Sequence, residues 1–436
     1  MKELLGLCGY KEEELEKELP RVKKVFERLG IAEEDLAIGK ERIRRFYDVE
    51  LSGIRRLLGI FLKELVRLVL AREEGKERII HACMASGFET IGSTFVTFSR
   101  HVYVEVPNSP FMVVLGSIFG KFTPILQEAE RLWLRAGAVK HCGMVKSRLG
   151  ILSLGLIPRP DVTVTSGFLC ETSAKTNDLI AELFGIPAVY YDTCQDREAR
   201  EAPFVQRTFE LAAFSLRKAV GELSRMVDFE IQDHMLLEVL EARRAYAEAV
   251  AKVKNLIRQS DPIPLASTHE NLLGWLIPMA LSIEALGEAK DAVETLYGEL
   301  KERVEKGIGI MQRGAPRLLS ILPSHHSDPR LEHLIDSLGM AIVASDYEFL
   351  APLPQGVGGV DGPLRRMCAG SEEFDRPPPY FQNRPYLGHM QETSDRWGAE
   401  SLPCGVQDGR IGRAHHKAGH RKGGWNSSTS FGVGEL

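Results

Sequence analysis

Residues 162–192 have the sequence VTVTSGFLCETSAKTNDLIAELFGIPAVYYD, and this stretch decides the fold. Residues 162–165 and 188–192 are strand-like, and residues 173–184 between them have the pattern of a helix. Gly185 follows that helix, as expected of a helix C-terminus where the backbone turns left-handed. A strand, a helix and a second strand in about 30 residues make a βαβ unit, which implies a parallel sheet.

Similar signals extend in both directions from this unit. Strand-like runs precede it at residues 78–82, 101–106 and 138–141. A second strand, helix and strand are expected at residues 317–322, 330–338 and 340–344. The sequence therefore predicts an α/β fold with two doubly wound parallel-sheet domains.

Helical patterns fill most of the remaining chain. Apolar residues recur at i, i+3 and i+4 over residues 54–70, which predicts a long amphipathic helix in an N-terminal helical layer. Residues 202–257 are almost continuously helical and predict two long connecting helices, followed by helices at 270–286 and 289–305. The predicted segments are an N-terminal helical segment (residues 1–75), a first α/β domain (76–205), a helical connection (206–312), the start of a second α/β domain (313–351) and a tail (352–436).

Composition excludes several classes of protein. The chain has 436 residues, of which 44% are hydrophobic and 26% charged, as in ordinary globular proteins. A net charge of −5 argues against a nucleic-acid binder that uses a basic face. The N-terminus lacks an apolar signal region, and the longest apolar runs are shorter than the ~20 residues of a membrane helix. Seven cysteines without a dense framework argue against disulfides, so a cytoplasmic location is expected.

The tail differs from the rest of the chain. Of the 40 glycines, 15 lie from Leu353 onward, and the periodicity of the preceding segments ends there. Two interpretations stay open. Either the tail is irregular, or the native reading frame is lost near Pro352, so that the second α/β domain is not completed.

Cys142 and Cys170 are the most informative pair of residues. Each follows a predicted strand, so both are expected at the edge of the sheet where ligands bind in doubly wound folds. Lys146, Ser147 and Arg148 follow the first cysteine, and positive charge favours the thiolate form that binds iron. The alternative is that both cysteines are buried structural thiols.

Other motifs are weaker. His325, His326 and Asp328 resemble half of a metal site, but such a pair of histidines in a loop after a strand is more often a polar rim. Cys83 and Cys194 also follow predicted strands and are further candidates for ligands, cleft residues or buried thiols. The glycine-rich pieces do not join a strand to a helix, so no phosphate-binding loop is predicted.

Three stretches resemble the 2-hydroxyacyl-CoA dehydratase and benzoyl-CoA reductase family. They are His141-Cys-Gly-Met-Val-Lys-Ser-Arg-Leu-Gly150, Thr165-Ser-Gly-Phe-Leu-Cys-Glu-Thr-Ser-Ala-Lys175 and Leu183-Phe-Gly-Ile-Pro-Ala-Val-Tyr-Tyr-Asp192. Later pieces at residues 270–274, 326–330 and 338–343 are similar to the family's second domain. The resemblance extends over roughly residues 77–347.

The resemblance implies a subunit that holds a [4Fe–4S] cluster through three cysteines. Cys142 and Cys170 match the first two ligands, and Cys404 is the better-placed candidate for the third, with Cys368 as the alternative. Lys146, Ser147 and Arg148 are then expected to hydrogen-bond cluster sulfurs or a substrate oxygen, as tentative catalytic residues.

The same resemblance implies a radical lyase reaction under anaerobic conditions. A separate ATP-hydrolysing iron–sulfur activator supplies one electron, and reduction of the acyl-CoA thioester to a ketyl expels the hydroxyl group. A homologous second subunit would complete a heterodimer. A benzoyl-CoA reductase subunit and a catalytically silent structural subunit remain as alternatives.

Overall fold

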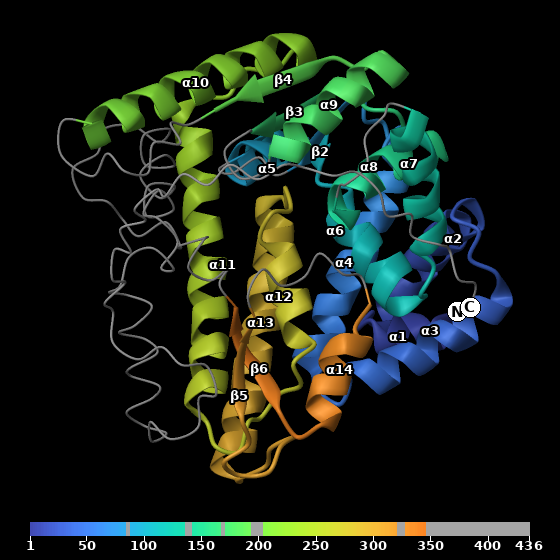
Figure 1. Cartoon of the computed structure of the whole chain (residues 1–436), viewed down its shortest axis with the longest axis vertical. Helices are drawn as coiled ribbons and strands as arrows, with labels where there is room; N and C mark the ends of the chain where they lie inside the picture. The colour runs from blue at the N-terminus through green and yellow to red at the C-terminus, as the bar shows by residue number, and fades with distance from the viewer. Residues whose placement is uncertain (84–87, 136–141, 167–170, 193–203, 321–327, 346–436) are drawn as a thin grey trace, which may run out of the picture. The chain divides into compact units, whose positions relative to one another are not determined.

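Four parallel strands form the main sheet of the protein (Figure 1). Their order is β2-β1-β3-β4, and their bounds are β1 (Arg78–Cys83), β2 (Val102–Glu105), β3 (Val162–Ser166) and β4 (Ala188–Tyr191). The computed structural model describes residues 1–83, 88–135, 142–166, 171–192, 204–320 and 328–345. Because all four strands run the same way, their carboxyl ends share one edge of the sheet.

Helices cover both faces of this sheet, as a parallel sheet requires. On one face, Ile80 and Ala82 of β1 join an apolar cluster with α5 (Phe88–Phe98) and α10 (Phe204–Val227). On the other face lie α8 (Gly143–Ser153) and α9 (Glu171–Phe184). Helix α9 ends before Gly185, whose φ of +61° is the left-handed conformation predicted from the sequence.

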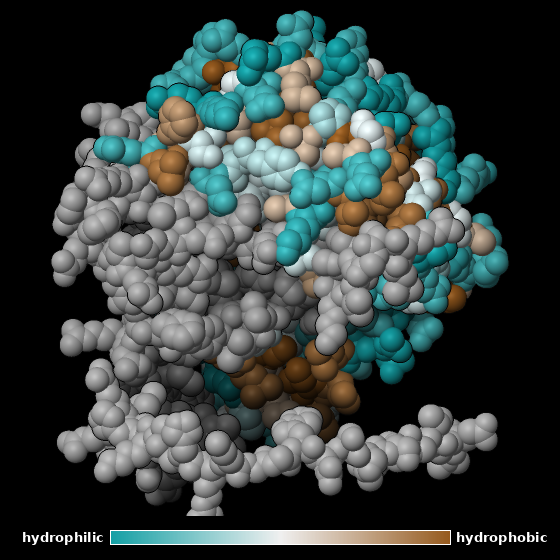
Figure 2. Space-filling view, turned by 45° about the horizontal axis from the view of Figure 1, so that its top comes forward, coloured by the Kyte–Doolittle hydropathy of each residue, from teal (hydrophilic) through white to brown (hydrophobic). Residues whose placement is uncertain are grey.

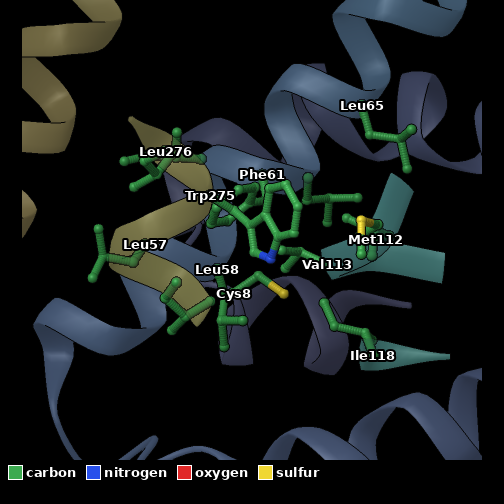
Figure 3. Close-up of a cluster of buried hydrophobic side chains, with 14 of the residues drawn as sticks. Cys8, Leu57, Leu58, Phe61, Leu65, Met112, Val113, Ile118, Trp275 and Leu276 are labelled. Atoms are coloured by element: carbon green, nitrogen blue, oxygen red, sulfur yellow. The ribbon is translucent and has the colours of Figure 1, made fainter. Parts of the chain in front are cut away.

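The N-terminal helices share one core with helices from the middle of the chain. The N-terminal set is α1 (Lys2–Leu7), α2 (Glu12–Arg28), α3 (Glu33–Phe46) and α4 (Ser52–Leu70), and the later set is α11 (Asp233–Gln259), α12 (His269–Leu276) and α13 (Ile283–Glu305). In Figure 3, Cys8 and Phe61 lie beside Trp275 of α12. The N-terminal helices are therefore packed into the body of the protein rather than set apart from it.

A buried π-helix joins the carboxyl end of β2 to this core. After β2 come α6 (Asn108–Phe111), the π-helix η1 (Met112–Ile118) and α7 (Thr123–Arg135). Every residue of the π-helix is buried, and Arg42 donates from Nε to the carbonyl oxygen of Ser117 over 3.0 Å. That bond satisfies one carbonyl group of this wider helix, whose backbone bonds differ from those of an α-helix.

A second, two-stranded parallel sheet lies near the end of the described chain. It consists of β5 (Arg317–Ser320) and β6 (Ala341–Ser345), connected by α14 (Arg330–Ser337). This βαβ unit matches the second strand, helix and strand expected from the sequence. The protein is thus an α/β protein with mostly helices and parallel sheets.

Most of the predicted elements are confirmed, but the bounds of two helices are wrong. The strands predicted at 78–82, 101–106, 162–165 and 188–192 are β1, β2, β3 and β4, whereas the run at 138–141 and the tail after residue 351 lie outside the described residues. The helices expected at 270–286 and 289–305 divide at another place, because α12 ends at Leu276 and α13 is continuous from Ile283 to Glu305. Residues 277–282, including Pro278, separate α12 from α13, because proline lacks the N–H that a helix interior needs.

On the face shown in Figure 2, many of the described residues are hydrophilic, and apolar areas lie among them. The large exposed apolar side chains include Leu211 and Phe214 of α10. They also include Leu331, Leu334 and Leu338, which lie along one face of α14 and the residue that follows it. None of the described helices is both long enough and apolar enough to cross a bilayer.

Candidate functional site

The candidate site lies where the strands of the main sheet end. Cys142 precedes α8 as its N-cap residue, with extended backbone angles, and its side chain is partly buried against two apolar clusters. The backbone N–H of Lys146 donates to the carbonyl oxygen of Cys142 over 3.1 Å, which closes the first turn of the helix. This cysteine therefore stands at the positive end of a helix, where anionic groups are stabilised.

A buried hydrogen bond ties α8 to the carboxyl end of β2. Asn108 follows that strand closely, and its Nδ2 donates to Oγ of Ser147 over 2.5 Å. Both side chains are fully buried. Because Ser147 belongs to the second turn of α8, this bond places the start of the helix at the edge where the strands end.

The start of α9 is fixed at the same edge. The hydroxyl groups of Thr165 and Ser173 both donate to the carbonyl oxygen of Cys83, over 2.8 and 3.2 Å. The two hydroxyl oxygens are 2.9 Å apart. The ends of β1 and β3 are thus joined to the first turn of α9, which begins one residue after Cys170 in the sequence.

The three polar residues behind Cys142 have different surroundings. The Nζ of Lys146 pairs with Glu130 of α7 at 2.6 Å, on the partly exposed side of α8. Ser147 is bonded to Asn108, as described above. Arg148 is only 3% exposed, and its Nη2 donates to Oδ1 of Asn177 on α9 over 2.6 Å. The structure thus places Ser147 and Arg148 in the interior and Lys146 nearer to solvent.

The face of the sheet beneath α8 and α9 carries buried titratable groups. His81 of β1 is 2% exposed, and burial, together with the charges of Arg148 and Arg72, lowers its pKa to about 3. Burial and the nearby carboxylate of Glu64 raise the pKa of Glu105, at the end of β2, well above its usual range. His81 is therefore neutral at pH 7, and the environment of Glu105 favours its protonated form.

The sequence patterns did not identify these polar groups as site residues. Asn108, Asn177 and Glu105 were not singled out, and His81 was counted only as part of a strand. A usable signal was present, since a histidine and a glutamate within apolar strands are unusual at buried positions. Their partners could not be inferred, because they depend on how the helices pack.

The other sequence candidates are placed only in part. Cys83 is fully buried at the end of β1, while Cys170, Cys194, Cys368 and Cys404 lie outside the described residues. Among the residues that the structure describes, no three histidine, cysteine or acidic side chains form a group that could hold a metal ion.

The possible metal half-site at Asp328 is not supported. Its Oδ1 accepts from Nη2 of Arg42 over 3.1 Å, and its Oδ2 accepts from Nε of Arg330 over 2.7 Å. The backbone N–H of Arg330 also donates to Oδ1. Both carboxylate oxygens are therefore engaged in holding the start of α14. His325 and His326 lie outside the described residues.

Comparison with known proteins places the chain in a family. The family described as "2-hydroxyglutaryl-CoA dehydratase, D-component" matches residues 105–398, which is more than half of the chain. The comparison with curated proteins finds no match. The matched range begins at the end of β2, contains Cys142, Cys170 and Cys368, and ends before Cys404. The chain therefore belongs to the 2-hydroxyglutaryl-CoA dehydratase D-component family.

Proposed function

We propose that this chain is the cluster-bearing component of a radical 2-hydroxyacyl-CoA dehydratase. The observation that carries the proposal is the position of Cys142 at the N-terminus of α8, within the range that matches the D-component family. A thiol at the positive end of a helix suits an anionic ligand of iron. The family's description as a D-component implies at least one partner component.

In this proposal, Cys142, Cys170 and a third cysteine hold a [4Fe–4S] cluster. Cys404 remains the first candidate for the third ligand, and Cys368, which falls within the family match, is the alternative. One buried cation near Cys142 in the sequence supports this assignment. The cationic side chain of Arg148 lies buried in α8, six residues after Cys142, and a cluster bound by three thiolates adds negative charge.

When bound, the cluster would supply a low-potential electron for an acyl-CoA thioester, received from a separate ATP-hydrolysing activator. The residues of this chain have other tasks. The dipole of α8 stabilises the thiolate of Cys142, whereas the cation of Lys146, near the start of the same helix, is paired with Glu130. The buried face of the sheet keeps water away from the site, as charge transfer in a closed site requires.

The α/β organisation also supports a second doubly wound domain that continues beyond β6. Three leucines, Leu331, Leu334 and Leu338, are each more than half exposed along one side of α14 and just after it. In a doubly wound domain such a face is covered by neighbouring elements. Completion of this domain would bring the third cysteine to the site.

Iron binding tests the proposal directly. Protein purified anaerobically and reconstituted with iron and sulfide should be brown and hold about four irons per chain. Cys142→Ala should lose most of this iron. Cys8→Ala removes another thiol that is 1% exposed in the N-terminal core, and should retain the iron. Colourless, iron-free wild-type protein after reconstitution would contradict the proposal.

The third ligand and the reaction are tested separately. Cys404→Ala and Cys368→Ala are compared for iron content, and the ligand is the residue whose loss releases iron. With its partner component and activator, the holoenzyme should dehydrate 2-hydroxyacyl-CoA substrates. Reduction of benzoyl-CoA instead would favour the reductase, and unchanged activity of the complex with Cys142→Ala would indicate a silent subunit.

A further inference from the structure

Two buried hydrogen bonds hold α8, the helix that begins after Cys142. Asn108 donates to Ser147 from the end of β2, and Arg148 donates to Asn177 on α9. All four side chains are almost completely buried, the most exposed being Arg148 at 3%. The first bond ties α8 to the sheet, and the second ties it to the helix that begins after Cys170.

The bond between Arg148 and Asn177 has an unusual chemistry. A buried guanidinium group is normally paired with a carboxylate, because burial of an unpaired charge is costly. Here the partner is the neutral amide oxygen of Asn177. Among the described residues, Nη1 of Arg148 and Nδ2 of Asn177 have no hydrogen-bond partner. The charge of Arg148 is therefore not neutralised by any carboxylate in this part of the chain.

Among the described side chains, the nearby His81 does not compensate this charge. His81, on the strand beneath, is held neutral by burial and by Arg148 itself. Two apolar side chains of similar volume would join the helices with less loss of solvation. A contribution to stability alone is thus a poor explanation for this pair. A role in fixing the geometry between α8 and α9, the helices that begin after Cys142 and Cys170, explains it well.

The bond between Arg148 and Asn177 affects how the starts of α8 and α9 are placed at the edge where the strands end. Ser173 fixes the first turn of α9 to the carbonyl oxygen of Cys83, and Ser147 fixes α8 to the end of β2. Each helix start is thus held to a strand end, and the bond between Arg148 and Asn177 sets the spacing between the two helices. A change in that bond would move Cys142 relative to the start of α9.

We propose that Asn177 is a positioning residue, which holds Arg148 and thereby fixes the distance between Cys142 and the start of α9. This inference rests on the proposed role of Cys142 as a ligand. Asn177 would not touch the cluster or the substrate. It would act through Arg148, as residues behind metal ligands do when they orient those ligands.

Co(II) is a suitable probe, because its thiolate complexes absorb strongly and need no iron or sulfide. Wild-type protein should give a thiolate absorption band that disappears in Cys142→Ala. We expect Asn177→Ala to weaken Co(II) binding by about 10- to 100-fold, the usual effect of losing a residue that orients a metal ligand. Asn177→Asp keeps an oxygen acceptor for Arg148 and should restore much of the affinity.

A matched control separates positioning from general loss of stability. Thr268→Val removes another buried hydrogen bond, from Oγ1 of Thr268 to the carbonyl oxygen of Phe46 over 2.8 Å, in the helical part of the protein. This variant should lose stability but bind Co(II) like the wild type. Wild-type Co(II) affinity in folded Asn177→Ala would overturn the inference.

Amide hydrogen exchange gives a second readout that does not depend on metal. In Asn177→Ala, the amides in the first two turns of α8 should exchange faster, while in Thr268→Val they should not. If wild-type protein shows no Cys142-dependent binding of Co(II) or iron, the cluster proposal fails, and this exchange experiment still tests the link. Unchanged exchange in α8 of Asn177→Ala would then refute it.

Discussion

The contact between α7 and α8 at Gly150 gives the sharpest stability prediction. A Cβ atom on Gly150 would lie 2.0 Å from the carbonyl oxygen of Ile125 on α7, and 2.9 Å from its carbonyl carbon. The atoms in the way belong to the backbone, so one helix must shift by about 1 Å to restore an ordinary contact. Such overpacking costs about 1–3 kcal/mol. The better helix propensity of alanine offsets ~1 kcal/mol of this cost.

We therefore expect Gly150→Ala to lower the free energy of unfolding by up to about 2 kcal/mol. Gly221→Ala is the matched control, because Gly221 is also helical, is exposed, and has no atom within 4 Å of a new Cβ. That variant should gain about 0.5–1 kcal/mol from helix propensity. Urea unfolding followed by circular dichroism measures both. If Gly150→Ala gains as much stability as Gly221→Ala, the close approach of α7 and α8 is wrong.

Three further predictions concern buried charges. The pKa of Glu105 is raised in the folded state. The contribution of this group to the stability of the protein is therefore complete below its unfolded pKa and is lost as pH rises through its folded pKa. Glu105→Gln should reduce this loss of stability, measured by urea unfolding at increasing pH. The pKa of His81 is lowered to about 3 in the folded state, so below about pH 6.5 the unfolded chain takes up a proton that the folded chain does not. The stability of the protein should therefore fall as the pH drops from about 6.5 to about 3. His81→Asn should make this fall smaller, measured by thermal melting. Burial raises the pKa of Glu270, but the charge of Lys254 at 3.2 Å outweighs it and lowers the pKa; Glu270→Gln should cost about 3 kcal/mol in urea unfolding at pH 7, and a loss below 1 kcal/mol would contradict the buried pair.

Local patterns were enough to predict the sheet. The strand, helix and strand of residues 162–192 carry their own turn and helix-end signals, and β3, α9 and β4 follow them closely. The break between α12 and α13 was missed because the apolar pattern of residues 270–286 continues through Pro278. At this position a rule about backbone hydrogen bonds outweighs the periodicity of side chains.

The expected position of Cys142 rests on a general rule, whereas the hydrogen bonds that hold α8 follow from no such rule. Parallel strands end at one edge, so a cysteine that follows a strand is expected there; the strand expected before Cys142, at residues 138–141, lies outside the described residues. The partner of Arg148 is different, because Asn177 lies 29 residues away, in the middle of a helix whose pattern gives no sign of which face is buried against α8. Only the packing of α8 and α9 on the sheet brings the two side chains together. If this link positions Cys142, residues that control a metal site must be sought in the buried contacts of its helices as well as in the cysteine motifs.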